Sequence, residues 1–106
     1  MITVKIHQIN IGRDKNGVIF QPFCKLSEIQ KTSAIDASIY DEVFNGEVDA
    51  NDLNDIFRMF NIDIPDGFQG HSLSVSDIIE VTKSKTVGKG AYYVDSFGFQ
   101  KVVFGA

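Results

Sequence analysis

Residues 51–61, NDLNDIFRMFN, contain the clearest helix pattern of the chain. Their large apolar side chains recur at positions i, i+3, i+4 and i+7, a spacing that places them on one stripe of a helix. The stripe consists of Leu53, Ile56, Phe57 and Phe60. Asp49 or Asn51 can cap the start, because a short polar side chain accepts hydrogen bonds from the first free amides of a helix. The pattern therefore predicts one main amphipathic helix over about residues 51–61.

On both sides of this helix, apolar residues alternate with polar ones, as in strands that bury one face. Ile2, Val4 and Ile6 alternate in this way, and a change of parity near His7 and Gln8 indicates a bulge or the end of the strand. Further strands are predicted over residues 78–81 and 91–94, with a last strand or short helix over residues 99–104. Over residues 39–44 strand and helix patterns compete, and the β-branched and aromatic residues favour a strand. These elements, joined by short polar turns, predict an α+β fold with a mainly antiparallel, curved sheet.

Residues 1–34 are expected to form a hairpin followed by a short helix. An Asn-Gly pair at residues 16–17 closes a polar turn between two apolar stretches, which is a strong hairpin signal. Ser27 and Gln30 have the spacing of a helix capping box. A length of 106 residues suits one domain. We therefore expect a single domain over residues 1–106, in which residues 35–104 complete the fold.

The composition is that of an ordinary globular protein, with 43% hydrophobic and 23% charged residues. The first residues lack the continuous apolar run of a signal peptide, and no stretch approaches membrane-spanning length. We therefore expect a cytoplasmic protein that does not contact membranes. The single cysteine, Cys24, follows Phe23 and is predicted to be a small buried hydrophobic residue.

The net charge of −4 is unevenly distributed. Between residues 36 and 66 the chain has nine acidic residues against one base, Arg58. We refer to them as the acid block: Asp36, Asp41, Glu42, Glu47, Asp49, Asp52, Asp55, Asp63 and Asp66. Solvated faces explain most charge runs of this kind. An acidic surface can also imitate the phosphates of DNA, so an antirestriction protein of the DNA-mimic type is one alternative.

Positive charge is concentrated in one predicted loop, residues 83–89, which contains Lys83, Lys85 and Lys89. Lysines on a loop can contact phosphates, and Tyr92 beside them can stack on a base. The loop therefore supports a second alternative, in which the domain binds nucleic acid. A net acidic chain with one short basic loop is otherwise poorly equipped for this task.

No motif for catalysis or metal binding is complete. In the acidic stretch at the predicted helix, Asn54 and Phe60 stand where a calcium loop needs a glycine and a glutamate. Ser, His and Asp occur together over residues 71–77, but without the Gly-x-Ser-x-Gly elbow of a hydrolase. A hydrolase would need a deep pocket that joins His71 to a neighbouring serine or to Asp95. We therefore predict that the protein is not an enzyme and uses no cofactor or metal ion.

Two motifs in the second half of the chain resemble those of the YodL-like family. The first is GHSLSVSDIIEV at residues 70–81, and the second is AYYVDSFGF at residues 91–99. Together with the residues upstream of them, the similarity covers about residues 35–104 and does not include the first 34. The resemblance implies a small domain of bacteria that is carried on conjugative or other mobile genetic elements, and it assigns no catalytic residue.

Each motif joins a turn rich in Ser and Asp to an apolar strand, so the two turns are predicted to lie at one end of a sheet. There they would form a polar patch that engages a protein partner. The predicted patch consists of Ser72, Ser74, Asp77, Asp95 and Ser96. Our leading expectation is a non-catalytic accessory or protein-binding module of a mobile element, with nucleic-acid binding and DNA mimicry as the alternatives.

Overall fold

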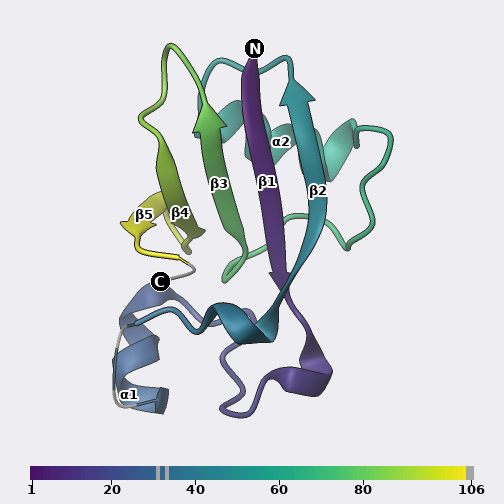
Figure 1. Ribbon diagram of the computed structural model, residues 1–106. Helices are drawn as coiled ribbons and strands as arrows, with labels where there is room; N and C mark the ends of the chain where they lie inside the picture. The colour runs from purple at the N-terminus through teal and green to yellow at the C-terminus, as the bar shows by residue number, and fades with distance from the viewer. Residues whose placement is uncertain (31, 33, 105–106) are drawn as a thin grey trace.

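The computed structural model describes residues 1–30, 32 and 34–104. Within them, the strands are β1 (Ile2–Ile9), β2 (Tyr40–Val48), β3 (Ile78–Lys83), β4 (Gly90–Val94) and β5 (Phe99–Val102). They form one sheet in the order β2-β1-β3-β4-β5, and all neighbours are antiparallel (Figure 1). The helices are α1 (Leu26–Gln30) and α2 (Leu53–Ile62), with short 3-10 turns at Ile11–Arg13, Phe23–Lys25 and Ala37–Ile39. This architecture confirms the predicted α+β class.

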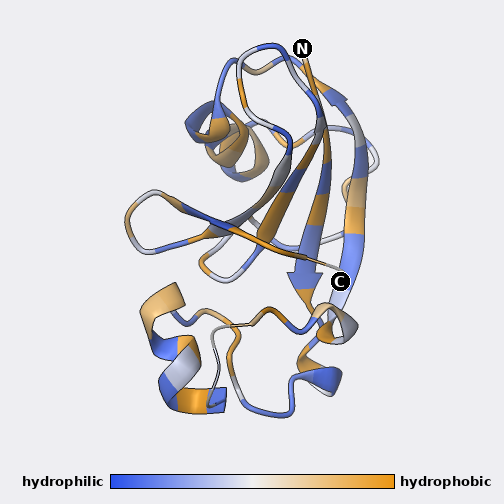
Figure 2. Ribbon diagram, turned by 60° about the vertical axis from the view of Figure 1, so that its left-hand side comes forward, coloured by the Kyte–Doolittle hydropathy of each residue, from blue (hydrophilic) through white to orange (hydrophobic). Residues whose placement is uncertain are grey.

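Helix α2 covers one face of the sheet and builds the first of two apolar cores (Figure 2). Ile56 and Phe60 are fully buried in this core, whereas Phe57 at its margin is 36% exposed. The apolar stripe read from the sequence therefore points at the sheet, with Phe57 at the boundary to solvent. No helix of the described residues, α2 included, is long and apolar enough to cross a membrane.

The cap of α2 is Asp52, not Asp49 or Asn51. The Oδ1 of Asp52 accepts the amide of Asp55 at 2.8 Å, and the amide of Asn51 donates to Oδ2 of Asp55 at 3.1 Å. This reciprocal pair satisfies amides that have no partner within the helix. The helix predicted over about residues 51–61 therefore begins at residue 53 and ends at residue 62.

Strand β1 contributes to both cores because its side chains alternate between the two faces of the sheet. Val4 and Ile6 pack in the core under α2, whereas Ile9 packs in the second core on the other face. The pairing of β1 with β2 does shift between Ile6 and His7, where a bulge was predicted, but the extra residue, Val43, lies on β2.

The second core lies beside the end of the sheet where β1 finishes, against the segment of residues 10–39 (Figure 1). Its buried members are Ile9, Val18, Leu26, Ile39, Ile78, Ala91 and Tyr93. Near the C-terminus, the Phe104 ring lies against His7 and Tyr40, with ring centroids 4.5 and 5.3 Å apart. Segments from the start, the middle and the end of the chain therefore meet in this core.

The predicted hairpin within residues 1–34 was wrong. Strand β1 pairs with β2 on one side and with β3 on the other, so neither of its edges is free for a hairpin partner. The carboxylate of Asp14 instead accepts the amides of Val18 and Ile19, at 3.0 and 2.9 Å. The chain turns at Gly17, whose φ of +68° favours glycine, and the described residues between this turn and β2 form no strand.

The short helix after this turn is confirmed as α1, but the capping box and the burial of Cys24 were wrong. Ser27 lies inside α1, because the 3-10 turn at Phe23–Lys25 leads directly into the helix. That turn directs Phe23 and Leu26 toward the second core. Cys24 lies between them on the outer side and is exposed.

Candidate functional site

The two turns rich in Ser and Asp lie at one end of the sheet, before β3 and after β4. The amide of Ser76 donates to the carbonyl of Val94, and the amide of Val94 donates to the carbonyl of Asp77, both at 2.9 Å. These bonds continue the pairing of β3 with β4 beyond the ends of the strands. The backbone therefore places the turns side by side, as the sequence predicted.

Asp77, the residue before β3, is fully buried. Its Oδ2 accepts the amide of Ser74 at 2.8 Å and the side-chain amide of Gln8 at 3.0 Å, while its Oδ1 has no partner among the described residues. Burial raises the pKa of the Asp77 carboxyl to about 7, against the lowering effect of the two hydrogen bonds. Asp77 therefore organises the turn from inside and is not a surface contact.

Gln8 on β1 joins this turn to the centre of the sheet. Besides its bond to Asp77, its Nε2 donates to the carbonyl of His71 at 2.8 Å, and its Oε1 accepts the amide of His71 at 3.1 Å. Gly70 lies against it, and a Cβ at that position would collide with Oε1 of Gln8 and displace the amide. Sequence reasoning missed Gln8, since one glutamine in a strand has no distinguishing pattern. The one signal in the sequence was the shift of the apolar residues from even to odd positions after Ile6, which leaves Gln8 at an even position expected to be buried.

His71 is exposed and forms no catalytic pair with Asp77. The Gln8 amide is bonded to both residues and separates them, and Nδ1 of His71 lies 2.8 Å from the carbonyl oxygen of Ser72. The hollow that Asp95 lines includes neither His71 nor Ser72. This arrangement gives no support to the hydrolase alternative.

Two residues with positive φ are joined by a hydrogen bond, one in the segment between β1 and β2 and the other in the turn before β3. Ser76 has φ +85° and Phe20 has φ +65°, a region that residues other than glycine rarely adopt. The Oγ of Ser76 accepts the amide of Phe20 at 2.9 Å, and its carbonyl accepts the Tyr40 hydroxyl at 2.8 Å. The surrounding bonds hold both residues in this conformation. They also fix residues 10–39 to the turn.

Asp95 and Ser96 lie in the tight turn between β4 and β5. Oδ1 of Asp95 accepts the amide of Ser96 at 2.8 Å and the amide of Phe23 at 3.1 Å. Both residues line a hollow of about 140 Å³, whose walls also include Phe57 from α2. Asp95 therefore has two roles in the structure: it ties the N-terminal segment to the turn and it borders an accessible hollow.

The same turn carries the most exposed aromatic side chain. Phe97 is 96% exposed, and its neighbours in the turn, Ser96 and Gly98, line the hollow. Aromatic side chains are enriched at protein interfaces. We refer to this region as the Phe97 surface, defined by Phe57, Asp95, Ser96, Phe97 and Phe99. Sequence reasoning did not include Phe97 in the predicted patch, which contained polar residues alone.

The five residues of the predicted patch share one end of the sheet but have different environments. Asp77 is buried, Ser74 is half-buried and Ser72 is exposed. Among the described residues, no hydrogen bond joins the side chains of these three residues to Asp95 or Ser96. The accessible part of the patch that borders a hollow consists of Asp95 and Ser96.

The lysine loop, residues 83–89, is solvent-facing. Its three lysines are exposed, and none has a carboxylate within salt-bridge distance in the described part of the chain. The Tyr92 ring, in contrast, packs against the first core, and its hydroxyl donates to the carbonyl of Gly88 at 2.7 Å. Nζ of Lys101 lies 5.9 Å from the centroid of this ring. Tyr92 is therefore already engaged by the protein, which reduces its use as a stacking platform.

The acid block falls into separate groups. Near the start of β2, a hydrogen bond from Ser38 lowers the pKa of Asp36, and one from Arg13 lowers the pKa of Asp41. In the first turn of α2, Asp52 and Asp55 bind backbone amides. A third group lines a hollow of about 370 Å³ at the other end of β2: Glu47, Asp49, Asp63 and Asp66. Asp55 shares a further hollow, of about 400 Å³, with Asp49 and Asp63, so the second and third groups adjoin. The carboxylates near the start of β2 are separate from them.

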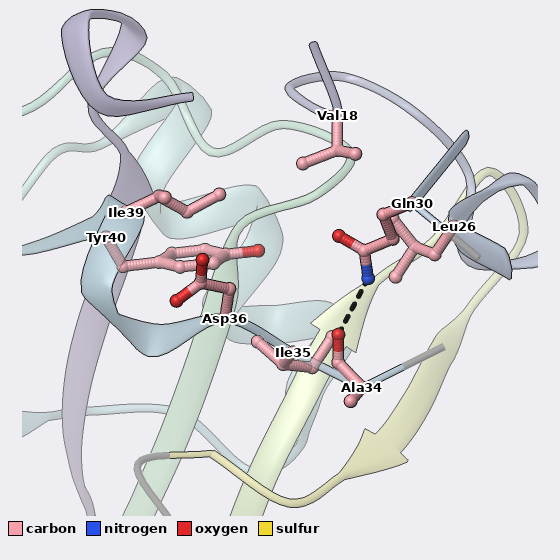
Figure 3. Close-up of a pocket in the computed structure, with 8 residues that line it drawn as sticks. All are labelled: Val18, Leu26, Gln30, Ala34, Ile35, Asp36, Ile39 and Tyr40. Atoms are coloured by element: carbon pink, nitrogen blue, oxygen red, sulfur yellow. Dashed lines mark hydrogen bonds between the residues drawn. The ribbon is translucent and has the colours of Figure 1, made fainter. Parts of the chain in front are cut away.

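The hollow drawn in Figure 3 lies inside the second core and is too small for a ligand. Its volume is about 10 Å³, room for about one water molecule. The Gln30 amide points to the carbonyl of Ala34, 2.7 Å away, and the Tyr40 ring forms part of the wall. Elsewhere in the described residues, no group of three or more His, Cys, Asp or Glu side chains is placed to hold a metal ion.

Comparison with known families completes the description of the site. A model of the YodL-like domain matches residues 3–104. The chain belongs to the YodL-like family. The resemblance over residues 35–104 was therefore too short, and the bonds of Gln8 and Phe20 to the first motif show how the N-terminal residues form part of the same unit. Searches of curated proteins and of solved structures found no match for the chain.

Proposed function

We propose that this YodL-like domain is a non-catalytic protein-binding module whose partner contacts the Phe97 surface. The observation that carries the proposal is the 96% exposure of Phe97 in a turn whose other residues, Asp95, Ser96 and Gly98, line a hollow of about 140 Å³. Asp95 and Ser96 supply polar groups at the margin of this apolar surface, an arrangement typical of protein interfaces. Ser72, Ser74 and Asp77 belong to the neighbouring turn before β3, which lies beside the turn that carries the Phe97 surface.

The same proposal includes the genomic and cellular context of the domain. Resemblance to the YodL-like family supports a bacterial protein of a mobile genetic element that acts as an accessory component in the cytoplasm. The polar side chains of both turns support a role without catalysis, because Ser76, Asp77 and Asp95 bind backbone amides of the domain itself. No cofactor enters the proposed role.

The test is capture of a partner by the tagged domain from lysate of the bacterial host, with and without nuclease. We expect a protein to be retained after nuclease treatment. Phe97→Ser should reduce its recovery at least tenfold, because the substitution removes the central apolar contact. Ile62→Ser is the matched control: Ile62 is 77% exposed on α2, away from the Phe97 surface, and its loss should leave recovery unchanged.

Two other results would replace this proposal with the alternatives. Recovery that disappears with nuclease and with Lys83→Glu, Lys85→Glu and Lys89→Glu would indicate nucleic-acid binding through the lysine loop. Retention of a DNA-binding protein that depends on Glu47 and Asp49, tested as Glu47→Gln and Asp49→Asn, would indicate DNA mimicry by the acid block.

A further inference from the structure

Strand β5 is the last strand of the sheet, and one of its edges is free in the described part of the chain. The amide of Asp95 donates to the carbonyl of Gly98 at 3.1 Å, so these two residues form a hydrogen-bonded pair. Hydrogen-bonded and non-hydrogen-bonded pairs alternate along antiparallel strands. Phe99 and Lys101 are the non-hydrogen-bonded positions opposite β4, and their peptide groups therefore point away from it. The one hydrogen bond to these groups in the described residues is a 3.4 Å contact from Gln100 to the carbonyl of Lys101.

The opposite edge of the sheet, strand β2, is protected. Its bulged residue, Val43, has its carbonyl bonded to the amide of Gln69 at 2.9 Å. Asp41, Glu42 and Glu47 add negative charge along the same strand. Bulges, covering loops and charges are the usual means of preventing strand addition. Strand β5 has a regular register, no proline and no acidic residue.

Two hollows flank β5, and they lie on opposite faces of the sheet. The hollow of about 140 Å³ adjoins Phe99, which packs on the core under α2. A second hollow, of about 390 Å³, adjoins Val102, which packs on the second core. Side chains of an extended chain point alternately to the two faces. A strand added beside β5 could therefore place one side chain in each hollow.

The charge at this edge is positive. Lys101 has no carboxylate within salt-bridge distance in the described residues, and its side chain lies against Gly88 and Gly90, which enclose Lys89. Opposite charges across an interface increase the rate of association and select the partner. An acidic side chain on the added strand would complement these lysines.

We propose that the partner of the Phe97 surface binds by adding an extended segment to the free edge of β5. The segment is a strand of a partner protein, with apolar side chains for the two hollows and an acidic residue opposite Lys101. Main-chain hydrogen bonds to Phe99 and Lys101 supply affinity, and the hollows supply selectivity. This inference rests on the proposed function, because it names how the partner of that surface binds.

The probe is a displayed library of random 12-residue peptides, selected on the wild-type domain. We expect enriched peptides that alternate apolar with polar residues and contain an acidic residue. On addition of such a peptide, nuclear magnetic resonance should show slower solvent exchange of the Phe99 and Lys101 amides, at least tenfold. The amides of Gln100 and Val102, which already face β4, should change little.

Variants of Lys101 separate the main chain from the side chain. Lys101→Pro removes the amide that points outward and spares the bonds to β4, since proline is tolerated at an edge where no donor is used. It should abolish peptide binding, whereas Lys101→Ala should retain binding and Lys101→Glu should weaken acidic peptides selectively. Unchanged amide spectra elsewhere would show that Lys101→Pro is folded. If Lys101→Pro does not fold, the exchange rates of the Phe99 and Lys101 amides in the wild type, with and without peptide, show whether the peptide adds as a strand.

The inference is overturned if selected peptides leave the Phe99 and Lys101 amides unprotected, or if a folded Lys101→Pro variant binds them normally. Protection that rises with protein concentration in the absence of peptide would overturn it in favour of a second copy of the chain. Loss of binding with Phe97→Ser but not with Lys101→Pro would retain the proposed function and reject strand addition. Failure to select any peptide, together with failure to capture a protein, would reject both.

Discussion

The two apolar cores of this domain are built in different ways. The first consists of a regular helix, α2, that places Ile56 and Phe60 on the sheet, and its contacts are almost entirely apolar. The second consists of short turns from residues 10–39, whose backbone is held by side chains of the sheet. Tyr93, for example, donates its hydroxyl to the carbonyl of Gln21 at 2.5 Å.

The difference shows what each core requires from the chain. Burial of apolar area stabilises the first core in proportion to the area removed from water. The second core also depends on individual polar bonds, and burial raises the pKa of both Tyr40 and Tyr93, so their hydroxyls stay protonated donors at all ordinary pH values. The Ser76 and Asp95 bonds to residues 20–23 have the same role. We therefore expect a large effect from truncation in the first core and a smaller effect from the loss of one polar bond in the second.

Phe60→Ala should have the largest effect on stability. Phe60 is fully buried, with ring centroids 5.0 Å from both Phe44 and Phe68. The substitution should reduce the free energy of unfolding by about 3–5 kcal/mol, because it removes apolar burial and leaves a cavity. Urea unfolding followed by far-ultraviolet circular dichroism and by tyrosine fluorescence measures the change. If the two cores form one cooperative unit, both signals will have the same midpoint; separate midpoints would show that the cores unfold independently.

The same difference explains what the sequence could predict. The stripe of α2 and the alternation of β1 are local patterns, so the first core and most of the sheet could be derived from them. The second core depends on contacts between residues far apart in the chain, such as Gln8 with Asp77 and Phe20 with Ser76. The Asn-Gly turn had a local hairpin signal that was overridden, because both edges of β1 were taken by distant strands.

For the candidate site, the sequence identified the two turns and their common end of the sheet. It could not show which polar side chains point inward, since Asp77 and Asp95 have similar surroundings in sequence but different burial. It also could not distinguish Phe97 from the buried aromatic residues near it. Exposure at the tip of a tight turn is a property of the folded structure.

Asp77→Asn should have an intermediate effect that depends on pH. In the folded protein the pKa of Asp77 is raised from 3.8 to about 7, so the folded state binds its proton more tightly than the unfolded state does. The contribution of this group is therefore fully present below pH 4 and is lost as the pH rises through 7. The loss amounts to a few kcal/mol at most. Asp77→Asn, which carries no titrating proton, should flatten this decline and be more stable than wild type at pH 8.

Urea unfolding at pH 4.5, 6 and 8 measures this dependence. Asp63→Asn is the matched control, because Asp63 is exposed and its removal should leave the pH profile of wild type unchanged. A steep decline of stability between pH 4.5 and 8 that persists in Asp77→Asn would show that another group is responsible.

Tyr93→Phe should have the smallest effect. The substitution keeps the buried ring of Tyr93 and removes the hydroxyl that donates to Gln21. Loss of one hydrogen bond to a half-buried carbonyl should reduce the free energy of unfolding by about 1 kcal/mol. Tyr92→Phe, which removes the bond to the exposed Gly88, is the comparison and should cost less. Equal costs would show that the polar bonds of the second core are no more important than those of a surface loop.

The role of the Phe97 surface can be tested most directly by photo-crosslinking in the bacterial host. Benzoylphenylalanine would be placed at position 97 in one variant and at position 62 in another, since both positions are exposed and apolar. We predict that illumination joins a specific protein to position 97 and not to position 62. The absence of any adduct at position 97, or the same adducts at both positions, would contradict the proposal that this YodL-like domain binds a protein through the turn between β4 and β5.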